Sequence, residues 1–164
     1  MGDIAAYILL FSIGFGALYA YQHRRLRTKH VRLSVQHYND CILKILLEKL
    51  HGKQQSIIVR IMARKDLELK NVQLELIDRQ RNFHNIHLDS GYPDFVIPES
   101  LGSTKYFDLK LPYESIEEMI RASEFPTKRF RFAVEHKRGK KFKSHELAIN
   151  RKGHIYKPDT GHYN

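Results

Sequence analysis

The chain has 164 residues and a formal net charge of +10, because 28 Lys and Arg outnumber 18 Asp and Glu. A single cysteine, Cys41, excludes a disulfide framework within the chain. The sequence contains no glycine-rich phosphate-binding loop and no Cys-x-x-Cys pair, which argues against nucleotide hydrolysis by a known loop motif. The positive charge therefore needs another explanation, such as contact with phosphate groups.

Residues 1–22 are predicted to form a transmembrane signal anchor. Residues 4–22 carry no charged side chain, and as a helix they would span roughly 28 Å, close to the hydrocarbon thickness of a bilayer. Their large apolar side chains lie all round the helix axis, whereas a core helix of a small domain keeps one face in water. A cleaved signal peptide is the main alternative. It is disfavoured because the residues before the apolar run are near neutral and Leu18 occupies a cleavage position that requires a small side chain.

Five cations follow the predicted anchor, and no carboxylate precedes them after residue 3. Positively charged flanks stay on the cytoplasmic side of a membrane, so we expect the amino terminus outside and the globular domain in the cytoplasm. These cations are also expected to contact anionic lipid headgroups. They are Arg24, Arg25, Arg27, Lys29 and Arg32.

Three small residues recur at intervals of four within the anchor: Ser12, Gly16 and Ala20. This spacing lets two membrane helices approach closely. Association of two anchors through this face, and therefore a homodimer, is one hypothesis for the state of the protein.

Residues 23–52 are predicted to form a basic juxtamembrane segment followed by a helix. The stretch "CILKILLEKLH" has apolar residues at helical spacing, so we expect a helix over 40–51 that ends at Gly52. For residues 28–38 the apolar spacing fits a helix that continues from the anchor and also fits a strand. The sequence leaves both open.

Residues 53–158 are predicted to form a β-rich globular domain. The apolar period changes to two after residue 55, and strands are expected at 56–63, 71–78, 82–88, 105–111, 129–136, 144–150 and 154–157. Ser115 and Glu118 match a capping box and predict a short helix over about 116–122. Many short strands with frequent turns are typical of an immunoglobulin-like β-sandwich, with a small β-barrel as the alternative, packed by one or two short helices. Residues 159–164 are expected to be a flexible tail.

A second basic region lies at residues 128–144, "KRFRFAVEHKRGKKFKS". Its cations could form a surface for a partner or ligand, and the predicted anchor favours lipid headgroups over nucleic acid as the source of phosphate. The candidate residues of this surface are Arg129, Arg131, Lys137, Arg138, Lys140 and Lys141.

No set of residues for catalysis stands out. His37 and Cys41 would share one face if their segment were helical, but no third group or oxyanion donor accompanies them. No cofactor or metal is expected. The sequence therefore predicts a non-enzymatic, single-pass membrane protein that presents a basic domain to a protein partner. A membrane-tethered sensor of a phosphorylated small ligand or nucleotide, which signals through helix association, and a structural subunit of a larger membrane complex are the alternatives.

Overall fold

The computed structural model describes residues 28–88, 96–125 and 127–158, which form two antiparallel sheets and one short helix. Sheet 1 has the strand order β1–β2–β3–β7, and sheet 2 has the order β11–β10–β8–β4–β5, with β6 paired to β4 and β9 to β8. The elements are β1 (Lys29–His37), β2 (Cys41–Leu50), β3 (Lys53–Ala63), β4 (Leu67–Ile77), β5 (Phe83–His87), β6 (Ser100–Leu101), β7 (Tyr106–Pro112), α3 (Tyr113–Ala122), β8 (Arg129–His136), β9 (Lys141–Lys143), β10 (Leu147–Ile149) and β11 (Ile155–Tyr156).

The predicted helix over 40–51 is wrong, because these residues form β2 in the interior of sheet 1. Cys41, Leu43, Ile45 and Leu47 alternate along the strand and are buried in the core. Some residues on the outer face, such as Ile42 and Leu46, are apolar as well. Together with the core-facing residues they produce the spacing of an amphipathic helix. Packing between β1 and β3 therefore decides the structure against local helix propensity.

The sequence did not decide between helix and strand for residues 28–38. Most of these residues form the edge strand β1. The helix stop expected at Gly52 is instead the turn between β2 and β3. His51 and Gly52 have φ values of 51° and 79°. Two consecutive positive φ angles suit the type of tight turn that joins twisted antiparallel strands, and glycine adopts them without strain.

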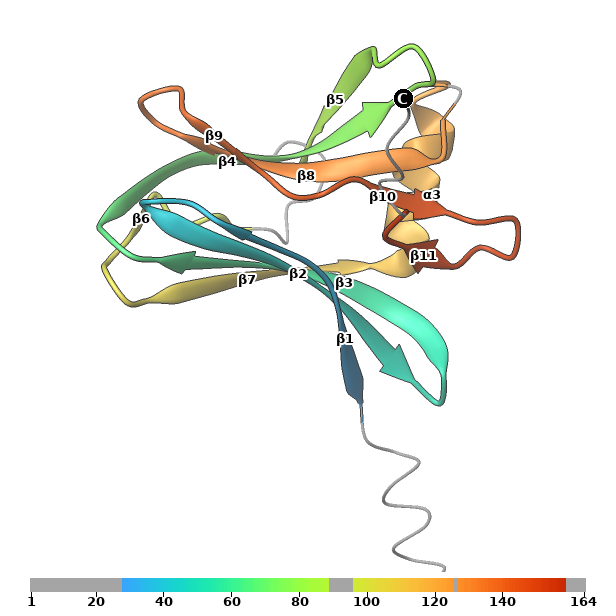
Figure 1. Ribbon diagram of the computed structural model, residues 1–164, viewed down its shortest axis with the longest axis horizontal. Coiled ribbons are helices and arrows are strands. Elements are labelled where there is room, and N and C mark those ends of the chain that lie inside the picture. The colour runs from blue at the N-terminus through green and yellow to red at the C-terminus, as the bar shows by residue number, and fades with distance from the viewer. Residues whose placement is uncertain (1–27, 89–95, 126, 159–164) are drawn as a thin grey trace, which may run out of the picture.

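The two sheets face each other across one apolar core (Figure 1). Leu43 and Ile45 of β2 and Leu74 and Leu76 of β4 belong to the same cluster of buried side chains, as does Phe132 of β8. Beside β1 the two layers are also joined by polar contacts. Ser34 Oγ lies 2.9 Å from His145 Nδ1, and the Tyr38 hydroxyl donates a hydrogen bond of 2.6 Å to the Lys143 carbonyl.

The strands predicted from the period-two pattern after residue 55 are confirmed as β3, β4, β5, β7, β8, β10 and β11, with differences of a few residues at their ends. The helix α3 is also confirmed, but it begins at Tyr113 after Pro112, and no side chain caps its amino terminus by a hydrogen bond. The predicted capping box of Ser115 and Glu118 is therefore wrong. Ser115 already lies inside the helix.

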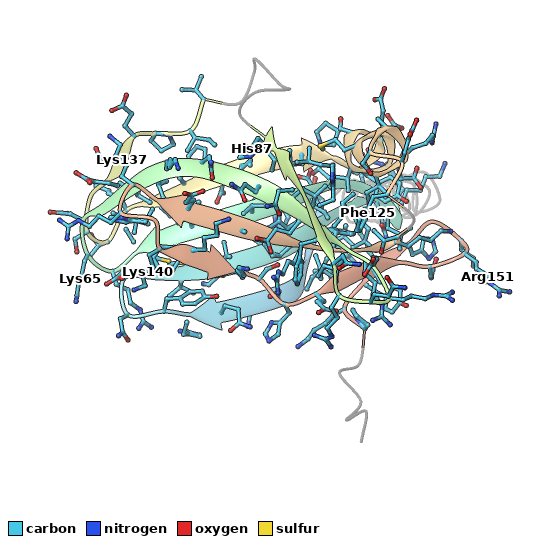
Figure 2. The ribbon with its side chains drawn as sticks, turned by 90° about the horizontal axis from the view of Figure 1, so that it is seen from above. Lys65, His87, Phe125, Lys137, Lys140 and Arg151 are labelled. Carbon is cyan, nitrogen blue, oxygen red and sulfur yellow. The ribbon has the colours of Figure 1, made fainter. Side chains whose placement is uncertain are left out.

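The strand directions define two ends of the domain, which Figure 2 shows on opposite sides. The end with α3, the β4–β5 turn and the β10–β11 turn is called the helix end, and Phe125 and Arg151 mark it. The end with the β3–β4 turn and the β8–β9 turn is called the hairpin end, and Lys65 and Lys140 mark it. Since β1 pairs antiparallel with β2, with Lys29 opposite Lys49, β1 starts at the helix end.

The predictions for the anchor at 1–22, its small residues Ser12, Gly16 and Ala20, the cations Arg24, Arg25 and Arg27, and the tail at 159–164 lie outside the described residues. Within the described residues, no helix has both the length and the apolar character needed to cross a membrane.

Candidate anion-binding cleft

A cleft of about 1010 Å³ opens at the helix end, between the end of α3, the β4–β5 turn and the segment that leads into β8. Five cations and one carboxylate line it, over apolar side chains. The cations are Arg79, Arg81, Arg121, Lys128 and Arg129; the carboxylate is Glu124; the remaining lining residues are Ile77, Ile120, Phe125 and Thr127.

The last turn of α3 forms one wall of the cleft. Ser123 ends the helix, where its backbone N–H donates to the Met119 carbonyl at 3.1 Å and its Oγ donates to the Ile120 carbonyl at 2.7 Å. Arg121, in this last turn, is placed near the negative end of the helix dipole. The same Ser123 Oγ accepts a hydrogen bond from the Phe125 N–H at 3.2 Å, so the chain turns back toward the cleft in a fixed geometry.

Thr127 fixes a second wall, formed by Lys128 and Arg129. Its hydroxyl donates to the Ile77 carbonyl at the end of β4, and the hydroxyl oxygen accepts the Arg129 N–H at 3.0 Å. The threonine therefore fastens the start of β8 to the end of β4. As a result, the side chains of residues 128 and 129 start from a backbone held on both sides.

The β4–β5 turn supplies the third wall. Asp78 accepts two hydrogen bonds from Asn82, one from the backbone N–H and one from the side-chain amide, both at 2.8 Å. These bonds close the turn that carries Arg79 and Arg81. Arg81 lies 3.8 Å from Glu146, a distance at the outer limit of an ion pair.

The charge in the cleft is largely uncompensated. Among the residues that the structure describes, Arg79, Arg121, Lys128 and Arg129 form no ion pair with a carboxylate. Cations held close together at fixed positions repel one another and attract an anion. The Phe125 ring, stacked on His84 with centroids 5.7 Å apart, adds an aromatic surface beside them.

The surface predicted from residues 128–144 does not exist as one patch. Of its six cations, only Arg129 lines the cleft. Arg131 Nε lies 2.6 Å from Glu75, and Lys141 Nζ donates to Gln73 at 3.4 Å, both on the outer face of sheet 2. The other three lie on the β8–β9 turn at the hairpin end: Lys137, Arg138 and Lys140.

Two of these three cations on the β8–β9 turn are paired with carboxylates. Lys140 Nζ lies 2.5 Å from Asp40, and Lys137 Nζ lies 3.3 Å from Glu99. The hydrogen bond from Lys140 holds the pKa of the Asp40 carboxyl below its ordinary value. Lys29 and Arg32 of the predicted headgroup set lie on β1, where both are exposed.

Four cations of the cleft were not among the candidate residues named from the sequence, namely Arg79, Arg81, Arg121 and Lys128, although Lys128 begins the basic stretch 128–144. The first two belong to the segment "RQR", which reads as a polar turn, and the third belongs to a helix with mixed charge. No local pattern links residues about 40 positions apart. Only the crossing of the chain between the two sheets brings them together.

The pairing of His37 with Cys41 is not formed. His37 lies opposite Ile42 on the outer face of sheet 1, whereas Cys41 points into the core and is 0% exposed. Burial, and then the neighbouring Asp40 carboxylate, raises the pKa of the Cys41 thiol to about 12. A buried thiol that stays protonated is a poor nucleophile.

We therefore expect Cys41 of the native full-length protein to resist alkylation by iodoacetamide at mildly alkaline pH. The thiol should react fully once the protein is unfolded in guanidinium chloride, which serves as the control. Mass spectrometry of both samples checks this expectation, and rapid alkylation of the native protein would contradict it.

Within the described residues, no three His, Cys, Asp or Glu side chains are grouped so that they could hold a metal ion. Comparison of the chain with protein families, with curated proteins and with solved structures gave no match in any of the three. The geometry of the cleft is therefore the basis for a functional hypothesis.

Proposed function

We propose that this protein is a non-enzymatic, single-pass membrane protein whose β-rich domain faces the cytoplasm and binds a phosphate-bearing ligand in the basic cleft. The observation that carries the proposal is that five cations and only one carboxylate line a cleft of about 1010 Å³. A cleft of this size is large enough for a small organic ligand, and apolar walls with a few polar groups are typical of ligand sites.

Phosphate is the anion that fits this set of side chains best. Three of the five cations are arginines that form no ion pair with a described carboxylate, and the planar arginine fork matches phosphate oxygens with two parallel hydrogen bonds. An extended nucleic acid is a poorer candidate. A backbone-tracking protein needs a continuous row of free cations, whereas Lys140 and Lys137 within the basic stretch 128–144 are paired with Asp40 and Glu99.

Titration of the full-length protein in a neutral detergent with pyrophosphate tests the proposal. We expect saturable heat of binding in isothermal titration calorimetry, with an affinity that falls as sodium chloride is added, because salt screens exposed charges. Acetate at matched ionic strength is the control anion and should bind far more weakly. The absence of saturable pyrophosphate binding at low salt would refute the proposed function.

We also propose that the two sheets form an immunoglobulin-like sandwich. The support comes from the pairing of β3 with β7 in one sheet and of β4 with β8 in the other. This is the arrangement of the B–E and C–F strand pairs in that class. The chain lacks the Cys-Trp-Cys set of antibody domains, since it has one cysteine and no tryptophan. An experimental structure with another strand order would refute this assignment.

A further inference from the structure

Cations without carboxylate partners collect at the helix end beyond the cleft itself. Lys29 at the start of β1, Lys49 and Lys53 beside the β2–β3 turn, and Arg151 and Lys152 in the β10–β11 turn form no ion pair with any described carboxylate. At the hairpin end, Lys65, Lys137 and Lys140 lie against carboxylates, whereas Arg64, Lys105 and Arg138 form no ion pair with a described carboxylate. Among the described residues, cations without a carboxylate partner therefore occur at both ends of the domain, and they are more numerous at the helix end.

The cleft and the β10–β11 turn belong to one continuous surface. A smaller hollow of about 230 Å³ shares Arg121 and Lys128 with the cleft and extends to Arg151 and Gly153. The Tyr113 hydroxyl donates to the Gly153 carbonyl, which holds the β10–β11 turn against α3. A hydrogen bond between β11 and β3 also brings the start of β3, in sheet 1, next to the β10–β11 turn.

The Ile155 N–H donates to Gln54 Oε1 at 3.0 Å, so β11 is attached to the start of β3. Lys53 precedes Gln54 directly, and Lys49 lies on the other side of the same hairpin, opposite Lys29. By strand direction, the β10–β11 turn, the β2–β3 turn and the start of β1 therefore lie at the same end as the cleft, and they are spread along it: in Figure 1 β1 starts at the bottom of the view and the β4–β5 turn lies at the top.

The position of β1 limits how far the helix end can lie from a bilayer. The apolar stretch of the sequence ends at residue 22 and β1 starts at Lys29, so six residues connect the two. A fully extended chain covers about 3.5 Å per residue, which limits this connection to about 20 Å. If the apolar stretch crosses a bilayer, the start of β1 lies within about 20 Å of the bilayer surface, which keeps the helix end within reach of it.

We infer that the helix end docks on an anionic membrane surface, with phosphate groups of acidic phospholipids entering the cleft. This inference rests on the proposed function, because it names lipid headgroups as the source of the bound phosphate. The free cations of the end are attracted to the negative surface potential of such a membrane, and the fixed arginines of the cleft bind individual headgroups. The domain is then held in one orientation and not merely tethered.

Hydrogen–deuterium exchange of the full-length protein, reconstituted into vesicles, tests the docking. One set of vesicles contains phosphatidylcholine alone, and the other contains phosphatidylcholine with phosphatidylglycerol. We expect several-fold slower exchange at residues 79–82, 121–128 and 150–153 in the phosphatidylglycerol vesicles, and no change at 64–66 and 137–140. Equal exchange in both sets of vesicles, or slowing at the hairpin end instead, would overturn the inference.

A matched pair of variants separates docking from binding in the cleft. Lys49→Gln with Lys53→Gln removes two charges of the docking surface outside the cleft, and Lys65→Gln with Lys105→Gln removes two charges at the hairpin end. The first variant should lose most of the slowing on phosphatidylglycerol vesicles and the second should keep it. Equal behaviour of the two variants would also overturn the docking.

The outcomes of the vesicle and pyrophosphate experiments are distinguishable. Binding of pyrophosphate in neutral detergent, without any slowing of exchange on phosphatidylglycerol vesicles, would overturn the docking and leave the proposed function standing with a soluble ligand. Failure to bind pyrophosphate would instead count against the proposed function itself.

Discussion

Replacing Glu75 by alanine is expected to lower the free energy of unfolding by about 3 kcal/mol. Glu75 lies on β4, at the centre of sheet 2, and is only 2% exposed. It accepts a hydrogen bond of 2.6 Å from Arg131 Nε, and Lys143 Nζ lies 3.4 Å away. The Phe83 ring covers both cations, at 4.7 Å from the Arg131 guanidinium carbon and 5.8 Å from Lys143 Nζ.

The expected loss comes from the charge that remains. The Arg131 side chain is 18% exposed, and without Glu75 its guanidinium has no carboxylate to offset its desolvation. Adding Arg131→Met to Glu75→Ala removes this unpaired charge, so the double variant should recover much of the stability. Such recovery would identify the buried charge, and not lost packing, as the cause.

Urea unfolding of the full-length protein in mild detergent, followed by circular dichroism, measures these differences. Glu99→Ala is the matched control, because the Glu99 side chain is 88% exposed and its ion pair with Lys137 is a surface pair worth less than about 1 kcal/mol. A loss for Glu75→Ala no larger than that for Glu99→Ala would contradict the prediction.

Glu75 also illustrates a limit of prediction from sequence patterns. The alternation in "NVQLELI" correctly predicts β4 and the buried Val72, Leu74 and Leu76. It also places Asn71, Gln73 and Glu75 on a solvated face, yet all three are buried. They are covered because β5 and β8 flank β4 and bring long side chains over its outer face. Burial of this kind depends on neighbours in space and leaves no periodic signal.

The strand β8 was therefore predictable from its pattern, and β2 was not. Residues 129–132 alternate between arginine and phenylalanine, and the predicted strand over 129–136 has the same bounds as β8. In β2, Ile42 and Leu46 are apolar although they face away from the core, so the pattern loses its period of two. The candidate site was harder still, because its cations come from a turn, a helix end and a strand start.

Replacing Arg121 and Lys128 together by glutamine is expected to weaken pyrophosphate binding about 100-fold. Both residues line the cleft, on the two walls formed by the end of α3 and the start of β8. A hydrogen bond to a charged group contributes about 1.5 kcal/mol or more, and that energy is about tenfold in affinity. Glutamine keeps a polar side chain but removes the charge, so the variant tests electrostatic attraction and not the loss of polar contacts in general.

The control variant removes one arginine and one lysine at the hairpin end, Arg138→Gln with Lys105→Gln, so the net charge of the two proteins is the same. Neither residue lines the cleft. If binding depends only on overall charge, both variants should weaken it equally. If it depends on cations fixed around the cleft, the control should stay within about twofold of the unmodified protein, because charges farther away than the Debye length of roughly 8 Å are largely screened at physiological salt. Calorimetric titration of both variants decides between the two cases, and equal affinities would remove the cleft as the binding site.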